Sequence, residues 1–180
     1  KGALVVLNDE INSAREVTKT DALRLQTFQS RATGVLGVVD PDRVVFYRGV
    51  VKRHSAASEF DVSKIAGLPR VDVLLVYQDA PGDLIRAAVD LGARGLVVAA
   101  AGAGATSGTQ SDGLAYAMGK GVTVVVTTRT GSGRISGTRR FGAAVVGGED
   151  LAPIKARILL MLALATAKDA ADIQRMFLEY

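Results

Sequence analysis

Three apolar stretches rich in β-branched residues constrain the fold of this 180-residue chain more than any other feature. They cover residues 71–77, 96–101 and 122–128, and none shows the alternation of apolar and polar residues that a half-exposed strand has. Between them, apolar residues recur at helical spacing over 84–91, and a second helix is expected over 111–118. Strands alternating with helices predict an α/β fold, with a small parallel sheet covered by helices on both faces.

The pattern continues to the end of the chain. A short fourth strand is expected over 143–146, followed by a helix over 151–167 with Asp150 as its N-cap. Asp169 is a suitable N-cap for a last helix that ends near Phe177. The helix over 151–167 is apolar almost all round, so we expect it to lie between the sheet and another surface.

The first part of the chain has a different character. Residues 2–7 are apolar without interruption and predict a fully buried strand. Residues 35–39 and 43–47 are two short β-type runs around Asp40-Pro41-Asp42, which predicts a hairpin. Residues 48–70 have mixed charge and no sustained period, which is typical of a connection between domains.

The composition excludes several classes of function. The chain has no cysteine and one histidine, His54, which argues against disulfides, cysteine or histidine metal sites and a Ser-His-Asp triad. Residues 158–165 form an apolar run far shorter than the ~18 residues that span a membrane. The net charge of +4 is too small to indicate nucleic-acid binding, and the arginines of 129–140 are more simply a solvated loop.

Ligands of parallel sheets bind beyond the carboxyl ends of the strands. Those ends lead here into 77–79, 102–105 and 127–130, which are rich in small and hydroxyl residues and suit a small polar ligand. The glycines of 102–108 also invite a phosphate-binding interpretation. The stretch lacks a Gly-Lys-Ser/Thr ending and a ribose-binding acid, so a strand-to-helix turn is the preferred interpretation.

Lys19 stands between Thr18 and Thr20 in an otherwise polar segment. From the spacing alone, a surface lysine is the simpler interpretation. A lysine with a lowered pKa could also take a proton from a threonine hydroxyl, which is a weak nucleophile. Within the chain, the only threonines that we would test for that part are Thr18, Thr20, Thr127 and Thr128.

Five segments together resemble bacterial L-asparaginases of the periplasmic, type II kind. In order along the chain they are ALVVLNDEINSAREVTKTDALRLQTF, GVLGVVD with VVFYR, FDVSKIAGLPRVDVLLVYQDAP, GARGLVVAAAGAGA and KARILLMLALATAKDAADIQRMFLEY. The resemblance covers residues 2–180. It implies that 1–47 form the end of an amino-terminal domain, 48–70 the interdomain linker, and 71–180 a flavodoxin-like carboxyl-terminal domain.

The same resemblance implies a function and an assembly. Such enzymes hydrolyse L-asparagine to L-aspartate and ammonia with a threonine nucleophile and without cofactor or metal. They are homotetramers, built as dimers of dimers with shared active sites. The family's catalytic lysine lies in a Val-Thr-Lys-Thr run and here corresponds to Lys19. The family's threonine motifs, Thr-Gly-Gly-Thr-Ile and His-Gly-Thr-Asp-Thr, are absent from these residues, so the nucleophile is expected upstream.

Two departures from the family pattern concern the substrate. Many members carry Asn or Ser in the loop where this chain has Ala105, which leaves the backbone of Ala105, or Thr106 beside it, to contact the substrate. Residues 133–142 contain no Asp or Glu, whereas many members place there an acid that helps to admit glutamine. Glutaminase activity is therefore in doubt.

A second hypothesis is a non-catalytic module that binds a small amino acid or assembles subunits. The absence of the threonine motifs favours this module for the chain in isolation, while the intact Lys19 segment favours the enzyme. The chain begins at Lys1, one residue before an apolar strand, which predicts a piece of something longer. No signal-peptide pattern is seen, and both a cytoplasmic and a periplasmic location stay open. No nucleic-acid or membrane partner is expected.

Overall fold

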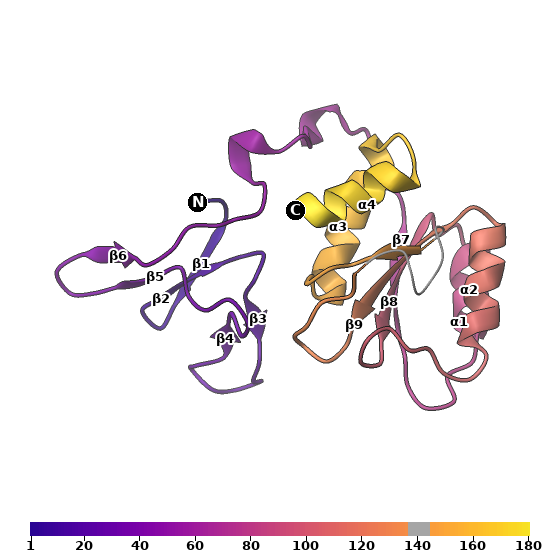
Figure 1. The fold of residues 1–180 in the computed structure, drawn as a ribbon, viewed down its shortest axis with the longest axis horizontal. Coiled ribbons are helices and arrows are strands. Elements are labelled where there is room, and N and C mark those ends of the chain that lie inside the picture. Colours follow the sequence, from indigo (N-terminus) through magenta and orange to yellow (C-terminus); the bar gives the residue numbers. More distant parts are fainter. Residues whose placement is uncertain (137–144) are drawn as a thin grey trace. The chain divides into compact units, whose positions relative to one another are not determined.

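The computed structural model describes residues 1–136 and 145–180 (Figure 1). It consists of two compact units, a first unit Lys1–Glu59 and a second unit Phe60–Tyr180. The division falls within residues 48–70, where two single-turn 3-10 helices, Ser55–Ala57 and Val62–Lys64, are the only regular structure.

The first unit is built from antiparallel strands. Its main sheet has the order β1-β2-β5-β6, and β3 and β4 form a separate two-stranded ladder. The predicted hairpin is confirmed, with Val39 opposite Val44 across its turn. The strands are β1 Leu4–Leu7, β2 Glu10–Ser13, β3 Thr18–Lys19, β4 Phe28–Gln29, β5 Gly37–Val39 and β6 Val44–Phe46.

A tight turn joins β1 to β2, a strand that the sequence pattern did not indicate. Leu7 pairs with Glu10, so only Asn8 and Asp9 form the loop, and their φ angles are 53° and 61°. Two consecutive left-handed residues are the geometry of a type I′ hairpin turn, which Asn and Asp tolerate better than most residues. The Asn-Asp pair therefore turns the chain back into β2, in which Ile11 is buried.

The predicted burial of the first strand is wrong, although the strand itself is present. Leu4, Val6 and Leu7 are 38%, 55% and 42% exposed. The physical reason is that β1 lies at an edge of the sheet and pairs only with β2. A continuous apolar run indicates a strand with two apolar faces, but it does not show what covers them.

The second unit contains the predicted parallel sheet. Its strands follow the order β10-β9-β8-β7, and every pair is parallel. This confirms the predicted α/β class and the four parallel strands; residues 143 and 144 of the expected fourth strand lie outside the described residues. The strands are β7 Val71–Leu75, β8 Gly95–Ala100, β9 Thr123–Thr128 and β10 Val145–Gly147.

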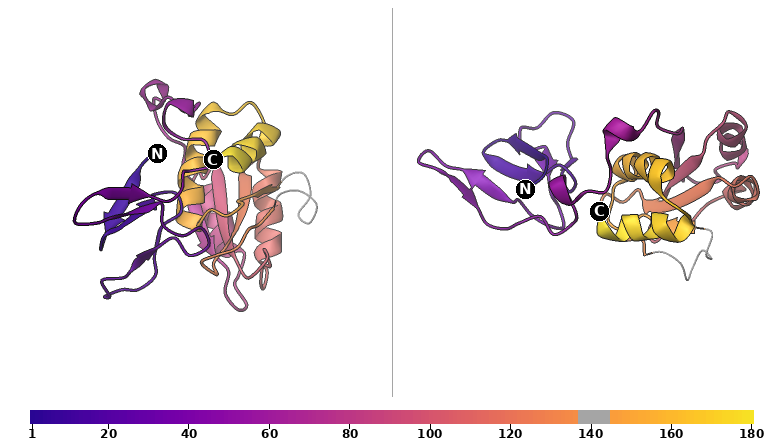
Figure 2. Two further views of the ribbon diagram at one scale, coloured as in Figure 1. Left: turned by 60° about the vertical axis from the view of Figure 1, so that its left-hand side comes forward. Right: turned by 90° about the horizontal axis from the view of Figure 1, so that it is seen from above.

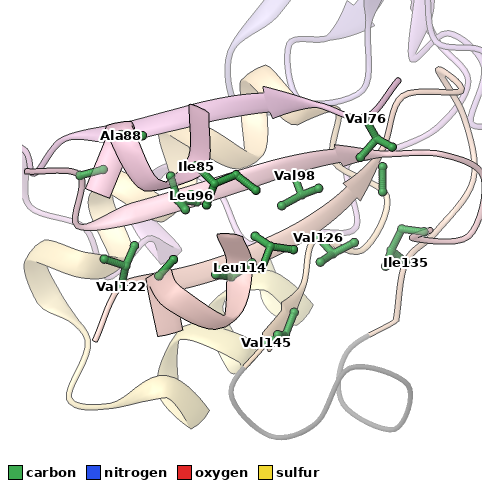
Figure 3. Packing of buried hydrophobic residues seen from close by; sticks show 14 residues of the cluster. Val76, Ile85, Ala88, Leu96, Val98, Leu114, Val122, Val126, Ile135 and Val145 are labelled. Carbon is green, nitrogen blue, oxygen red and sulfur yellow. The ribbon is translucent and has the colours of Figure 1, made fainter. Parts of the chain in front are cut away.

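Helices cover both faces of this sheet, as the strand pattern predicted (Figure 2). Helices α1 (Asp83–Asp90) and α2 (Gln110–Gly119) lie over one face, and α3 (Pro153–Thr166) and α4 (Ala170–Glu179) over the other. Figure 3 shows the layer of side chains between the sheet and the first pair, with Ile135 beside Val126 at one end. The buried residues of this layer are Val76, Ile85, Ala88, Ala93, Leu96, Val98, Ala100, Leu114, Ala117, Val122, Val124, Val126, Ile135 and Val145.

The second layer depends on α3 and α4. In α3, Ala156, Leu159, Leu160 and Ala163 are buried, but Ile154 and Ile158 are 69% and 53% exposed. The expected contact of α3 with the sheet is present, while the second surface expected against the side that bears Ile154 and Ile158 is not supplied by the described residues and stays a prediction.

The two predicted helix caps have different outcomes. Asp169 caps α4 as expected, since its carboxylate accepts from Asp172 N at 2.8 Å. Asp150 does not cap α3, whose cap is Ala152 without a side-chain bond. Pro153, in the first turn, has a fixed φ suited to a helix start and needs no donor partner, so the helix begins two residues later than expected.

None of the helices in the described part of the chain is long and apolar enough to cross a membrane.

Two glycines of α2 provide a matched test of the packing between α1 and α2. A Cβ at Gly113 would lie 2.8 Å from Gly82 O and 3.0 Å from Ile85 Cβ, whereas a Cβ at Gly119 would meet nothing within 4 Å. We expect Gly113→Ala to lower the free energy of unfolding by about 1–3 kcal/mol, partly offset by the helix propensity of alanine. Gly119→Ala should leave it unchanged or raise it by up to about 1 kcal/mol. Urea denaturation measures both, and equal midpoints for the two variants would contradict the close approach.

Candidate functional site

Lys19 lies on a short, hydrogen-bonded strand of the first unit. It is the last residue of β3 and stands opposite Phe28 of β4. Its ammonium nitrogen is 5.9 Å from the centre of the Phe28 ring, and the residue as a whole is exposed. The backbone at Lys19 is thus fixed by the pairing of β3 with β4. Its side chain is exposed to solvent in the part of the chain that the structure describes.

The turn after Lys19 is held by threonines. Thr20 donates both its N–H and its hydroxyl to Thr27 O, at 2.7 Å and 3.0 Å. The Thr27 hydroxyl in turn donates to Asp21 O and accepts from Asp21 N, the latter at 3.1 Å. These bonds join the two strands just beyond Lys19 and therefore fix the direction in which β3 ends.

Asp21 orders the tip of the same turn. One oxygen of its carboxylate accepts from Leu23 N at 2.8 Å and from Arg24 N at 2.9 Å. These two backbone donors hold the pKa of Asp21 below its ordinary value of 3.8, and the charge of Lys19 lowers it further. Leu23 and Leu25 are 93% and 83% exposed on this ordered tip.

Among the described residues, the hydroxyl groups of Thr20, Thr127 and Thr128 have hydrogen-bond partners. Thr127 is fully buried and its hydroxyl donates to Val98 O at 3.0 Å. The Thr128 hydroxyl lies 2.9 Å from that of Thr130. Thr18 is half-buried in β3. Thr20 and Thr127 thus use their hydroxyl protons in structural bonds.

In the second unit, the loops beyond the carboxyl ends of β7 and β8 are bonded to each other. Asp79 N donates to the Ser107 hydroxyl at 2.9 Å, and Gly82 N donates to the Thr109 hydroxyl at 3.0 Å. The buried Gln110 side chain donates to Leu75 O at 3.2 Å. Hydroxyl and amide side chains of one loop thus hold the backbone of the other.

The glycine-rich loop after β8 is a tight turn. Ala101 and Ala105 exchange two backbone hydrogen bonds, of 3.1 Å and 3.0 Å. A Cβ at Gly108, whose φ is 50°, would lie 2.5 Å from Ala80 O, so this glycine is required by the neighbouring loop. Ala105 therefore has its N–H engaged within the turn, and Thr106 beside it is exposed.

The loop after β9 is exposed over residues 129–134, as the arginine cluster suggested, and it is anchored at one end by an ion pair and a buried residue. Arg134 forms an ion pair through Nε with Glu149, whose side chain is only 4% exposed. Ile135 is buried and exchanges two backbone hydrogen bonds with Glu149, of 2.9 Å and 3.0 Å. Arg139 and Arg140 of the same cluster lie outside the described residues. No local sequence pattern indicated Glu149, because its partner Arg134 stands 15 residues away along the chain.

No three His, Cys, Asp or Glu side chains gather as a metal site within residues 1–136 and 145–180.

Comparison with known proteins places this geometry in a family. A family model described as the glutaminase/asparaginase C-terminal domain matches residues 70–177, and one described as the N-terminal domain of asparaginase matches residues 1–52. The two matched segments contain the parallel sheet and Lys19, respectively. The chain belongs to the asparaginase/glutaminase family, which confirms the resemblance drawn from its sequence.

Individual relatives agree with this assignment. The chain is 41% identical to an L-asparaginase 2 of Bacillus subtilis, with all of this chain and 48% of the relative aligned. It is 36% identical to an L-asparaginase 2 of Escherichia coli, with all of this chain and 53% of that protein aligned. A crystal structure of a probable cytoplasmic L-asparaginase from Campylobacter jejuni superposes on the whole chain with a TM-score of 0.94 and 40% identity, over 56% of its length. The chain spans about half the length of the curated relatives that it matches.

The Asp21 turn should respond to acid in a defined way. Because the pKa of Asp21 is lowered in the folded chain, its bonds to Leu23 and Arg24 are complete above the ordinary value of 3.8 and are lost as the pH falls through the folded value. Titration of the Leu23 and Arg24 amide resonances should therefore show a midpoint below 3.8. In Asp21→Asn the side-chain oxygen still accepts, so the turn should persist without that transition, whereas Asp21→Ala should lose the turn at every pH. A wild-type midpoint above the ordinary value would contradict this account.

Proposed function

We propose that this chain forms part of an L-asparaginase, which hydrolyses L-asparagine to L-aspartate and ammonia. The observation that carries the proposal is the match of both family models to one chain, together with the Val-Thr-Lys-Thr run whose Thr18 and Lys19 form β3. In this reaction a threonine hydroxyl attacks the side-chain amide carbon, and backbone N–H groups stabilise the oxyanion. Protonation of the amide nitrogen releases ammonia, and water then hydrolyses the acyl intermediate. No cofactor or metal takes part in the proposed chemistry.

We propose that the amine of Lys19 accepts the proton of the attacking threonine hydroxyl. A threonine hydroxyl is a poor nucleophile at neutral pH and needs an acceptor within hydrogen-bond reach. The amine of Lys19 is held on a fixed backbone and is exposed, so it is accessible to a partner. We place the nucleophile outside these 180 residues, because the threonine motifs are absent here and the relatives are about twice as long.

We further propose that residues 1–47, 48–70 and 71–180 serve as the end of the amino-terminal domain, the linker and the carboxyl-terminal domain. In the last of these, Thr106 is the better candidate for a substrate contact. Its side chain is exposed, whereas the N–H of Ala105 already donates to Ala101 O. Ala105 retains only its carbonyl for a second bond.

Two observations favour the alternative of a non-catalytic binding or assembly module for the chain alone. Thr20 already donates its hydroxyl proton to Thr27 O, and Thr127 donates its hydroxyl proton to Val98 O. Asparagine-dependent release of ammonia discriminates the two functions, since a module would bind the amino acid without turnover.

Lys19→Met tests the enzyme directly, because it keeps most of the apolar stem and removes the amine. In the assembly that hydrolyses asparagine we expect kcat to fall by about 10²–10⁴-fold with a much smaller change in KM. The matched control is Lys120→Met, since Lys120 also lies over an aromatic ring, 5.5 Å from the centre of Tyr116. The control should retain wild-type kcat. Retention of more than half of wild-type kcat by Lys19→Met would reduce Lys19 to a structural residue.

We also propose that the chain assembles into a homo-oligomer, a tetramer built as a dimer of dimers. Support comes from the outer side of α3, where Ile154 and Ile158 are exposed in the chain taken alone. Light scattering at micromolar concentration should then give a mass several times that of the 18.7 kDa chain. A mass equal to one chain would refute the assembly.

A further inference from the structure

The ion pair between Arg134 and Glu149 lies at the carboxyl edge of the parallel sheet and has two energetically unfavourable properties. One oxygen of Glu149 accepts from Arg134 Nε, and the other, Oε1, is buried without a partner among the described residues. The φ angle of Glu149 is 53°, a conformation that glycine or asparagine adopts at less cost. Gly148 before it cannot be replaced easily, because a Cβ there would lie 2.5 Å from Thr127 Cγ2.

These properties do not serve stability. The carboxylate of Glu149 loses its hydration on burial, and only one of its oxygens gains a partner, Arg134, whose side chain is itself 60% exposed. A non-glycine residue in the left-handed region adds a further cost. Glycine or asparagine at position 149 would cost less free energy of folding than glutamate does. Unfavourable features of this kind persist at positions that a function requires.

The position of the pair indicates which function that is. Glu149 is the second residue after β10, and residues 129–134 follow β9, so both lie beyond the carboxyl ends of neighbouring parallel strands. Ligands of such sheets bind at this edge. The Ile135–Glu149 backbone bonds fix one end of the loop, and the Thr128–Thr130 hydroxyl contact fixes the other. The ion pair adds a side-chain bond from the exposed arginine to the buried acid.

We propose that the Arg134–Glu149 pair positions residues 129–134 as one wall of the amino-acid site, and that Glu149 is thus a positioning residue for substrate binding. The inference rests on the proposed asparaginase function. Because the loop would contact the substrate in the ground state and in the transition state alike, its displacement changes KM more than kcat.

The test uses three variants in the assembly that hydrolyses asparagine. Glu149→Gln weakens the bond, since an amide oxygen accepts less strongly than a carboxylate, and Arg134→Met removes the bond altogether. KM for asparagine should rise about threefold or more in Glu149→Gln and on the order of tenfold in Arg134→Met, with kcat changed less than about threefold in both. Arg134→Lys keeps the charge and should stay within about threefold of the wild-type KM. Glu149→Gln leaves no buried charge unpaired, so it still decides the test if Arg134→Met fails to fold.

Asp72→Asn is the matched control. It breaks the Arg70–Asp72 ion pair of 2.8 Å, which lies at the amino end of the same sheet, and it should leave KM unchanged. A purely structural pair would lower the thermal midpoint of Glu149→Gln and leave its KM at the wild-type value, which would overturn this inference while the asparaginase function stands. A wild-type assembly that releases no ammonia from asparagine would instead overturn the proposed function, and the positioning role with it.

Discussion

The burial of β8 and β9 on both faces is the constraint on which the second unit depends. Every residue of β8 is buried, as is every residue of β9 except Thr123. These two central strands need a helix layer on each side, since neither of them has a face that can be left in water. The sheet is therefore stable only with its four helices in place. The loops at its carboxyl edge are attached to these rigid strands and helices. Rigid elements hold functional groups in place better than loops do.

The carboxyl-edge loops are ordered by polar side chains. Ser107, Thr109 and Gln110 bond backbone groups of the β7 side, and Glu149 bonds the loop after β9. Short hydroxyl and amide side chains suit this task because they reach neighbouring backbone groups and leave little freedom to be lost on ordering. The edge is thus ordered by side chains of the chain itself, so a ligand that binds there would not have to order these loops.

The sequence allowed the second unit to be predicted well and the first unit only in part. Continuous β-branched runs and helical spacing located all four parallel strands and their helices, because local pattern and burial agree there. Strand β2 escaped prediction, since Glu10, Asn12 and Ser13 are polar and Ile11 alone is apolar; the Asn8-Asp9 turn was the signal that could have found it. The pairing of Glu149 with Arg134 depends on two strand ends that meet only in the folded sheet, so no local pattern indicates it.

The two candidate parts of the site are positioned by different physical means. In the second unit the loops stand on a core of fully buried strands. In the first unit Lys19 stands on a two-residue strand opposite the half-buried Phe28, and the direction of this strand is fixed by the Thr20–Thr27 bonds and the Asp21 turn. Such local bonds contribute little to overall stability, about 1 kcal/mol each, but they set geometry over a few residues. The position of the lysine is therefore governed by the polar residues of segment 18–28, which explains why so apolar a chain contains so polar a stretch there.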